Sequence, residues 1–169
     1  MSELQQLHDR EAFTPMNIKN LSPEERKRAL DTIVFMVEKR DGQIKIRACT
    51  NGKKQRIWTD KNDTSSPTVS TEAVLLTAVI DAKEGRDVMT SDIPNAFVQT
   101  QNELDKDGEQ VFMKIKGVLV DMLIELDPHK YKNKVVYEKG EKVLYLLVLK
   151  AIYGLLKSAM LFYKKNDEI

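Results

Sequence analysis

Short apolar runs separated by turn residues dominate the first third of the chain. Thr32–Val37 is β-branched and apolar, and Gln43–Thr50 alternates in a strand-like way after the turn residues Asp41-Gly42. This pattern predicts a β-hairpin. Asn51-Gly52 is a second turn signal and leads into Lys53–Trp58. We therefore expect a ribbon with two turns over this part of the sequence.

Helical patterns flank the predicted ribbon. Ser22–Glu25 combines a serine cap, a proline at the first helical position and a glutamate at the capping-box position, which predicts a short helix to about Asp31. Thr71–Glu84 has helical periodicity behind a Ser or Thr cap and is ended by Gly85. Its apolar stripe is expected to be part of the core: Val74, Leu75, Ala78 and Val79.

The second half of the chain predicts further strands and helices. Asp87–Met89 and Val111–Lys116 read as strands, and Val118–Leu126 as a helix stopped by Asp127-Pro128. The other expected elements are an acidic loop at Asn102–Glu109, a hairpin of Val135–Glu138 with Lys142–Leu149, and a helix from about Ser158. Strands and helices mixed with hairpins indicate an α+β fold. Residues 1–21 are expected to be a loose lead-in to a domain spanning 22–169.

Composition excludes several classes of protein. With 169 residues, 41% hydrophobic and 31% charged, the chain is long enough and apolar enough for a globular domain. Cys49 is the only cysteine, so no internal disulfide forms, and the two histidines lack metal-ligand spacing. The N-terminus has no signal-peptide pattern, and Val143–Leu149 is too short to cross a bilayer. We expect an intracellular protein, cytoplasmic or nuclear, that is neither secreted nor membrane-bound.

Charge is lopsided only around the predicted ribbon. The formal net charge is +1, yet residues 38–61 contain eight Lys or Arg and three acids, an excess of five positive charges. A basic ribbon can neutralise nucleic-acid phosphates. The alternative is an ordinary solvated hairpin, and composition alone favours it slightly.

The stretch Thr90–Thr100 has the most suggestive chemistry and reads TSDIPNAFVQT. Asp92 follows the short predicted strand that ends at Met89, a position from which a carboxylate can face a cleft. An aspartate at a turn or helix start is the commoner explanation of such a pattern, and these residues alone favour it.

Four blocks of sequence, in order, carry a resemblance to a known family. They are IKIRACTNGKKQR, SPTVSTEAVLLTAVIDAKEG, TSDIPNAFVQT, and VFMKIKG followed by LKAIYGLLKSAMLFYKK. From about Phe35 to Tyr163 the chain resembles the reverse transcriptase of copia-type LTR retrotransposons. The resemblance implies the fingers and first part of the palm of an RNA-directed DNA polymerase, an enzyme that joins nucleotides with two divalent metal ions.

The resemblance implies roles for particular residues. Asp92 matches the first metal-binding aspartate, Ile93 a backbone position beside the incoming triphosphate, and Phe97 an aromatic under the sugar that disfavours a ribose 2′-hydroxyl. Arg47 matches the arginine that grips the triphosphate, assisted by Lys45.

Further matches concern the template side. Tyr153 and Gly154 match a block near the template base and the nucleotide, although a core role for Tyr153 is almost as well supported. The same resemblance implies contacts with template phosphates from Lys53, Lys54 and Arg56. The implied cofactor is Mg²⁺ or Mn²⁺, and the implied partners are an RNA or DNA template-primer, deoxynucleoside triphosphates and the remainder of the retrotransposon polyprotein.

Two departures limit the implied activity. The family's second and third aspartates form an adjacent pair, whereas this sequence has no Asp-Asp and ends at Ile169. After Gly154 the chain reads LLKSA where the family usually has LKQSP. We therefore expect a fragment, truncated before the Asp-Asp hairpin and inactive alone. The alternatives are a non-catalytic nucleic-acid-binding domain and a decaying transposon remnant without function.

Overall fold

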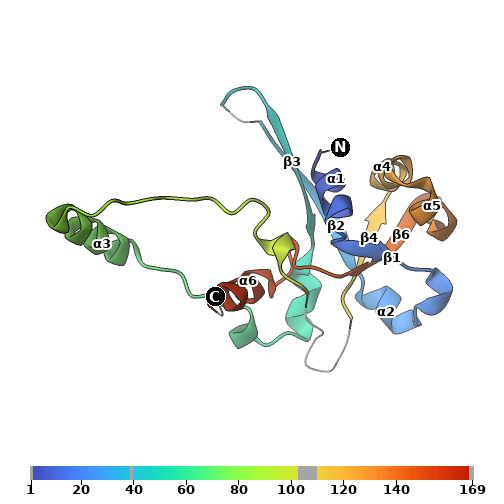
Figure 1. The fold of residues 1–169 in the computed structure, drawn as a ribbon. Helices are drawn as coiled ribbons and strands as arrows, with labels where there is room; N and C mark the ends of the chain where they lie inside the picture. Colours follow the sequence, from blue (N-terminus) through green and yellow to red (C-terminus); the bar gives the residue numbers. More distant parts are fainter. Residues whose placement is uncertain (1, 39, 103–109, 168–169) are drawn as a thin grey trace.

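The computed structural model describes residues 2–38, 40–102 and 110–167, and within them a curled mixed sheet is packed with several helices (Figure 1). This agrees with the α+β expectation. The strands are β1 (Phe13–Pro15), β2 (Leu30–Glu38), β3 (Ile44–Thr50), β4 (Phe112–Lys116), β5 (Val136–Glu138) and β6 (Glu141–Val148). The α-helices are α1 (Ser2–Asp9), α2 (Pro23–Arg28), α3 (Thr71–Glu84), α4 (Val118–Leu126), α5 (Pro128–Tyr131) and α6 (Ser158–Asp167). The 3₁₀ helices are η1 (Ile18–Asn20), η2 (Gly52–Ile57), η3 (Lys61–Asp63), η4 (Phe97–Gln99) and η5 (Lys132–Lys134).

Strand β2 belongs to two parts of the sheet. The strand order is β1-β6-β4-β2-β3, with β5 paired to β6. Leu30 and Asp31 pair in parallel with β4, whereas the other pairings are antiparallel. From Thr32 onward β2 pairs with β3 and projects from the sheet as a two-stranded arm (Figure 1). We call residues 32–38 and 44–50 the β2–β3 ribbon.

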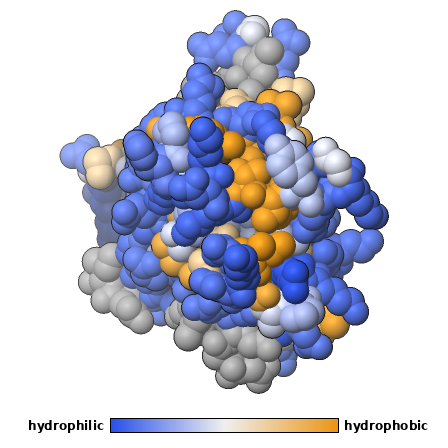
Figure 2. All heavy atoms as spheres, turned by 90° about the vertical axis from the view of Figure 1, so that its right-hand side faces the viewer, coloured by the Kyte–Doolittle hydropathy of each residue, from blue (hydrophilic) through white to orange (hydrophobic). Residues whose placement is uncertain are grey.

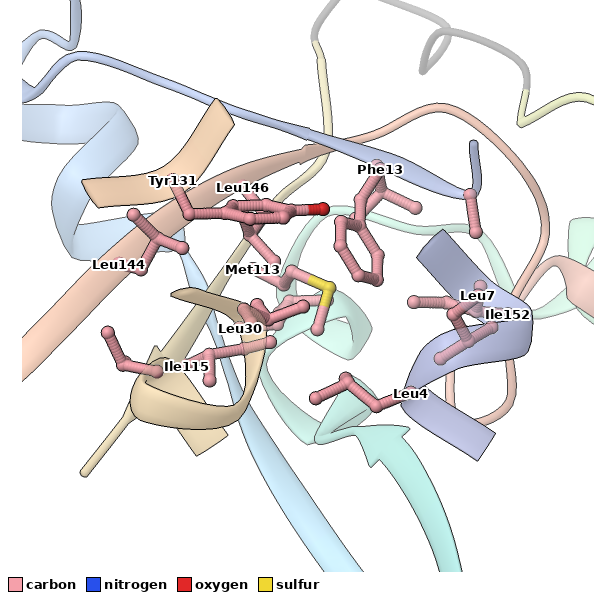
Figure 3. Close-up of a cluster of buried hydrophobic side chains, with 14 of the residues drawn as sticks. Leu4, Leu7, Phe13, Leu30, Met113, Ile115, Tyr131, Leu144, Leu146 and Ile152 are labelled. Atoms are coloured by element: carbon pink, nitrogen blue, oxygen red, sulfur yellow. The ribbon is translucent and has the colours of Figure 1, made fainter. Parts of the chain in front are cut away.

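The main core lies on one face of β4 and β6. Alternate residues of these strands, such as Ile115 and Leu146, point into it because successive side chains of a strand face opposite sides. Figure 3 shows Phe13, Leu30 and Tyr131 directed into the same cluster, together with Leu4 and Leu7 of α1. Helices α4 and α5 complete this layer. The burial of most β6 side chains thus explains the near-continuous apolar run of this strand.

A smaller cluster covers the opposite face of the same strands. Phe112, Val143 and Tyr145 are buried there against Leu21 and Ala29. These last two residues flank α2, whose start is fixed by the predicted capping box between Ser22 and Glu25. Figure 2 shows the side of the molecule that carries α2, α4 and α5, where hydrophobic residues gather in the middle of a hydrophilic surround.

The expectation of a loose lead-in over residues 1–21 is wrong. Residues Ser2–Asp9 form α1, and Phe13–Pro15 pair with β6. Leu4, Leu7 and Phe13 are at most 6% exposed. The i, i+3 spacing of the two leucines is a helical signal, but a helix of about two turns with only two apolar residues does not stand out in a polar sequence.

Two predicted strands are absent from the described structure. Lys53–Trp58 does not extend the ribbon, because Asn51 caps the Lys53 amide with its side chain and the chain enters η2. Asp87–Met89 has no regular structure, and the side chains of Val88 and Met89 are 68% and 88% exposed. Of the predicted acidic loop, residues 103–109 lie outside the described residues.

Helix α3 has the predicted bounds and caps but not the predicted environment. Ser70 accepts a hydrogen bond from the Ala73 amide, and Gly85 ends the helix in the left-handed conformation. None of its residues is buried, so the expectation that its apolar stripe is core is wrong. Figure 1 shows α3 standing away from the sheet on extended connections. Among the described residues, no helix is long and apolar enough to cross a membrane.

Candidate functional site

The base of the ribbon is locked to the Tyr153-Gly154 turn. The backbone amide and the hydroxyl of Thr50 both donate to the Tyr153 carbonyl oxygen, at 2.9 and 3.2 Å. Gly154 has a φ of +93°, and a Cβ there would lie 1.9 Å from the Thr50 carbonyl oxygen. A Cβ at Gly52 would in turn lie 2.2 Å from the Gly154 oxygen. Only glycine permits this approach of three backbone segments.

Gln55 strengthens the same junction from η2. Its side chain is 4% exposed, and its Oε1 accepts a hydrogen bond of 3.0 Å from the Leu156 amide. A buried amide needs such a partner. The start of α6 is fixed nearby, since the Ser158 hydroxyl donates to the Ile152 carbonyl oxygen at 2.7 Å. The turn at 152–156 is therefore held from both sides.

This junction brings together three candidate residues from distant parts of the chain. The Arg47 guanidinium lies 5.4 Å from the centre of the Tyr153 ring, a cation–π contact. The ring of Phe97 meets Tyr153 edge-to-face at 5.1 Å between centroids. Arg47 is exposed and the two rings are half-buried. We call Arg47, Phe97 and Tyr153 the arginine–aromatic cluster; Gly154 lies directly beside it.

Phe162 of α6 supports the cluster and was not identified from the sequence. Its ring meets Phe97 edge-to-face at 6.1 Å. Lys165, one turn later, donates to the Gln99 carbonyl oxygen at 2.6 Å. Both contacts tie η4, which carries Phe97, to α6. The sequence signal was an aromatic pair, Phe162-Tyr163, within an otherwise polar helix end, which also fits ordinary packing.

Asp92 and Ile93 are not members of the arginine–aromatic cluster. Both are exposed, in a segment without regular structure that leads into η4. The expected position at the end of a strand is wrong, because residues 87–89 form none. Within the described ranges, no three His, Cys, Asp or Glu side chains come together as a metal site. A pair of Mg²⁺ ions needs several carboxylates, so the described residues do not fit the implied metals.

The three basic residues expected to face a template lie on η2 and differ in environment. Lys53 and Arg56 are exposed. Lys54 instead donates to the Ala29 carbonyl oxygen at 3.2 Å and approaches the Asp31 carboxylate at 3.5 Å. Burial acts to raise the pKa of Asp31, but Lys54 and Lys116 outweigh it and hold that pKa below its ordinary value. Lys54 thus contacts groups within the protein, and its expected contact with template phosphates stays a prediction.

Lys45 is placed only by its backbone, which pairs with Val37 in the ribbon. Its side chain lies outside the described part of the structure, so its expected part in holding a triphosphate stays a prediction. The register puts its backbone two residues before Arg47 on the same strand.

A separate hollow of about 510 Å³ lies between α2 and the residues before β4. Its lining includes Trp58, over whose ring the Arg28 guanidinium lies at 4.5 Å, and the carboxylate-bearing Glu24. None of the functional-site residues predicted from the sequence lines this hollow. The arginine–aromatic cluster is therefore an exposed surface site and not part of this hollow.

Comparison with known proteins identifies no relative: no family model, curated protein or solved structure matches the chain.

Proposed function

We propose that the chain is the fingers and first part of the palm of a copia-type reverse transcriptase, and that the arginine–aromatic cluster is its nucleotide-binding surface. The observation that carries the proposal is the convergence of Arg47, Phe97 and Tyr153. These residues are 50 and 56 positions apart in sequence (97 − 47 and 153 − 97). The family resemblance assigned nucleotide contacts to each of them separately.

The chemistry of the cluster suits a nucleoside triphosphate. Arg47 presents a permanently charged guanidinium at the exposed edge, and guanidinium groups bind phosphate oxygens with two parallel hydrogen bonds. The half-buried rings of Phe97 and Tyr153 offer apolar surfaces for a sugar or base. Gly154 lets the backbone approach closely without a side chain. A phosphate-gripping cation beside flat apolar groups is what a nucleotide requires.

The same proposal implies that the 169 residues do not polymerise by themselves. Two-metal nucleotidyl transfer needs several carboxylates, and the sequence offers Asp92 without an adjacent aspartate pair. Asp92 and Ile93 precede Phe97 of the cluster by five and four positions along the chain. In the full enzyme, Mg²⁺ or Mn²⁺ would be held by Asp92 together with the carboxylates of the adjacent aspartate pair.

Nucleotide binding and polymerisation by the chain test this proposal separately. Titration with a deoxynucleoside triphosphate in the presence of Mg²⁺, followed by calorimetry, should give saturable binding. Primer extension on an RNA template should give no incorporation. Absence of saturable triphosphate binding would contradict the nucleotide-binding surface, and robust extension would contradict the claim that the chain is inactive alone.

A second function, non-catalytic binding of nucleic acid, is favoured by one observation. Lys53 and Arg56 are exposed on η2, beside the junction that carries Arg47. Phosphate contacts of this kind weaken with salt, roughly in proportion to the number of cations engaged. An Arg47→Ala variant should then still bind template-primer, with an affinity that falls steeply as salt increases. A variant with both Lys53→Ala and Arg56→Ala should lose this binding. These two results together would favour this function over nucleotide binding.

A further inference from the structure

Helix α3 exposes apolar side chains around most of its circumference. Five large residues are 40–65% exposed: Val74, Leu75, Leu76, Val79 and Ile80. Successive residues of an α-helix are rotated by about 100°, so three consecutive apolar residues already span more than half of the surface. A helix that is apolar on most sides is typical of a buried position. The exposed environment of α3 thus conflicts with its sequence.

Local interactions alone do not explain why α3 is a helix. It has 14 residues, with valine, isoleucine and threonine at five of them. Isolated helices of this length are marginal in water even when alanine-rich, and β-branched residues lower helix propensity further. The Ser70 cap and the Gly85 cap contribute only about 1 kcal/mol each. A packing partner is therefore needed.

The β2–β3 ribbon carries an unpartnered apolar surface of its own. Ile33, Phe35 and Val37 are 37%, 52% and 61% exposed. They alternate along β2 and so share one face. Arg47 lies directly opposite Phe35 in the register and belongs to the same face. A two-stranded ribbon without a packed face is itself marginal in water.

The two surfaces match in position. In Figure 1 α3 and α6 lie on one side of the ribbon and α1 on the other, and the contact of Arg47 with Tyr153 directs its face toward the side of α6. Strand β3 has two basic residues and no acid, whereas α3 has three acids and one lysine. Two of these acids, Asp81 and Glu84, already pair with Arg86, so charge adds little to the match of the apolar surfaces.

The connections of α3 leave it free to reach the ribbon. Residues 64–70 and 85–96 join it to η3 and η4 and contain no helix or strand. Extended chains span about 3.3 Å per residue, so these connections reach about 23 and 40 Å. A partner tethered this way has a high effective concentration, which favours docking within one chain over association between chains.

We propose that α3 docks on the face of the β2–β3 ribbon formed by Ile33, Phe35 and Val37, within the same chain. Docking removes both apolar surfaces from water, the dominant favourable contribution to such packing. The docked helix would lie beside Arg47 and form a wall next to the arginine–aromatic cluster. The inference depends on the apolar surfaces and the connections, and stands whether or not the cluster binds nucleotides.

Paired cysteines test this docking directly. In a Cys49→Ala background, Val37→Cys with Val79→Cys places one thiol on the ribbon face and one on α3. Treatment with a short thiol-reactive cross-linker should give cross-linked monomer, identified by mass spectrometry of peptides. The matched control pairs Val79→Cys with Val34→Cys, an exposed residue on the opposite face of the ribbon.

The control decides the outcome. The Val37→Cys/Val79→Cys protein should form the intramolecular cross-link at least about tenfold faster than the Val34→Cys/Val79→Cys protein. This ratio is small compared with the gain in effective concentration that a short tether provides. Equal rates for the two pairs, no cross-linked monomer, or cross-linked dimers alone would each overturn docking within the chain.

Hydrogen exchange provides a readout that needs no cysteine. Amides of α3 should exchange at least about tenfold more slowly in the unmodified chain than in a Phe35→Asp variant, since docking raises the free energy of local opening. Amides of α4, which belongs to the main core, should exchange alike in both proteins. Equal exchange of α3 in the two proteins would contradict the proposal even if the cysteine variants failed to fold.

Discussion

Gly154 and Thr50 are in contact through their backbones so closely that no side chain fits between them. A Cβ at Gly154 would lie 1.9 Å from the Thr50 carbonyl oxygen and 2.9 Å from its amide nitrogen. The same Thr50 amide donates to Tyr153. Because Thr50 ends the strand that carries Arg47, this contact sets the distance between the arginine and the Tyr153 ring. The arginine–aromatic cluster depends on it.

Gly154→Ala should therefore destabilise the protein strongly. The substitution combines a positive φ, which costs an alanine about 1 kcal/mol, with a clash against backbone that cannot rotate away. We expect a loss of about 3 kcal/mol or more in the free energy of unfolding, measured by urea denaturation with circular dichroism.

Gly140→Ala is the matched control. Gly140 also has a positive φ, +83°, but nothing lies within 4 Å of a Cβ at that position. The free energy of unfolding of this variant should fall by only about 1 kcal/mol, the cost of placing an alanine at a positive φ. Equal losses for the two variants would show that the contact with Thr50 does not hold the junction.

Gln55→Ala tests the second attachment of the same junction. Removing the side chain leaves the Leu156 amide without its partner at a part-buried position, which costs about 1–3 kcal/mol. Gln99→Ala is the control, because Gln99 is exposed and bonds the nearby Pro94 carbonyl oxygen. Urea midpoints of the two variants should differ clearly. A Gln55 variant as stable as the Gln99 variant would contradict the assigned role.

The free energy of unfolding should fall at high pH because the side chain of Tyr131 is buried. Its side chain is fully buried, its hydroxyl lies 2.8 Å from His8 Nδ1, and burial raises its pKa from 10.0 to about 12. A pKa raised on folding adds stability that is complete below pH 10 and is lost as pH rises toward 12. The loss should be about 2–3 kcal/mol.

Tyr131→Phe isolates this contribution. Tyr145 also has a raised pKa, because it is buried and donates to Glu138, so the variant should keep part of the decline. The free energy of unfolding between pH 9 and 12 should fall less steeply in Tyr131→Phe than in the unmodified chain. Identical slopes would mean that Tyr131 ionises as freely in the folded protein as in the unfolded one.

Local signals predicted much of the secondary structure. The capping box at Ser22, the caps of α3, the β2–β3 turn and the apolar run of β6 each depend on neighbours within a few residues, and their elements appear as expected. Residues 52–57 form a 3₁₀ helix that begins with the Asn51 cap, but the close approach of its Gly52 to Gly154 is a contact over 102 positions (154 − 52). No local pattern contains that information.

The residues of the candidate site were likewise predicted only in part. Arg47, Phe97, Tyr153 and Gly154 were identified by the family resemblance, and the structure brings them together. Phe162 was not identified from the sequence, because its contact with Phe97 depends on how α6 packs against η4. Asp92 was expected at a strand end but is exposed in an irregular segment, since Val88 and Met89 find no strand partner and stay in water.

Triphosphate binding by an Arg47→Ala variant tests the central claim most directly. Arg40→Ala is the control, because it removes the same charge from the exposed turn of the same ribbon. Calorimetric titration with a deoxynucleoside triphosphate and Mg²⁺ should show affinity at least about tenfold weaker for Arg47→Ala, the value of one charge-assisted hydrogen bond, and unchanged for Arg40→Ala. Equal affinity in all three proteins would contradict a nucleotide site at the arginine–aromatic cluster.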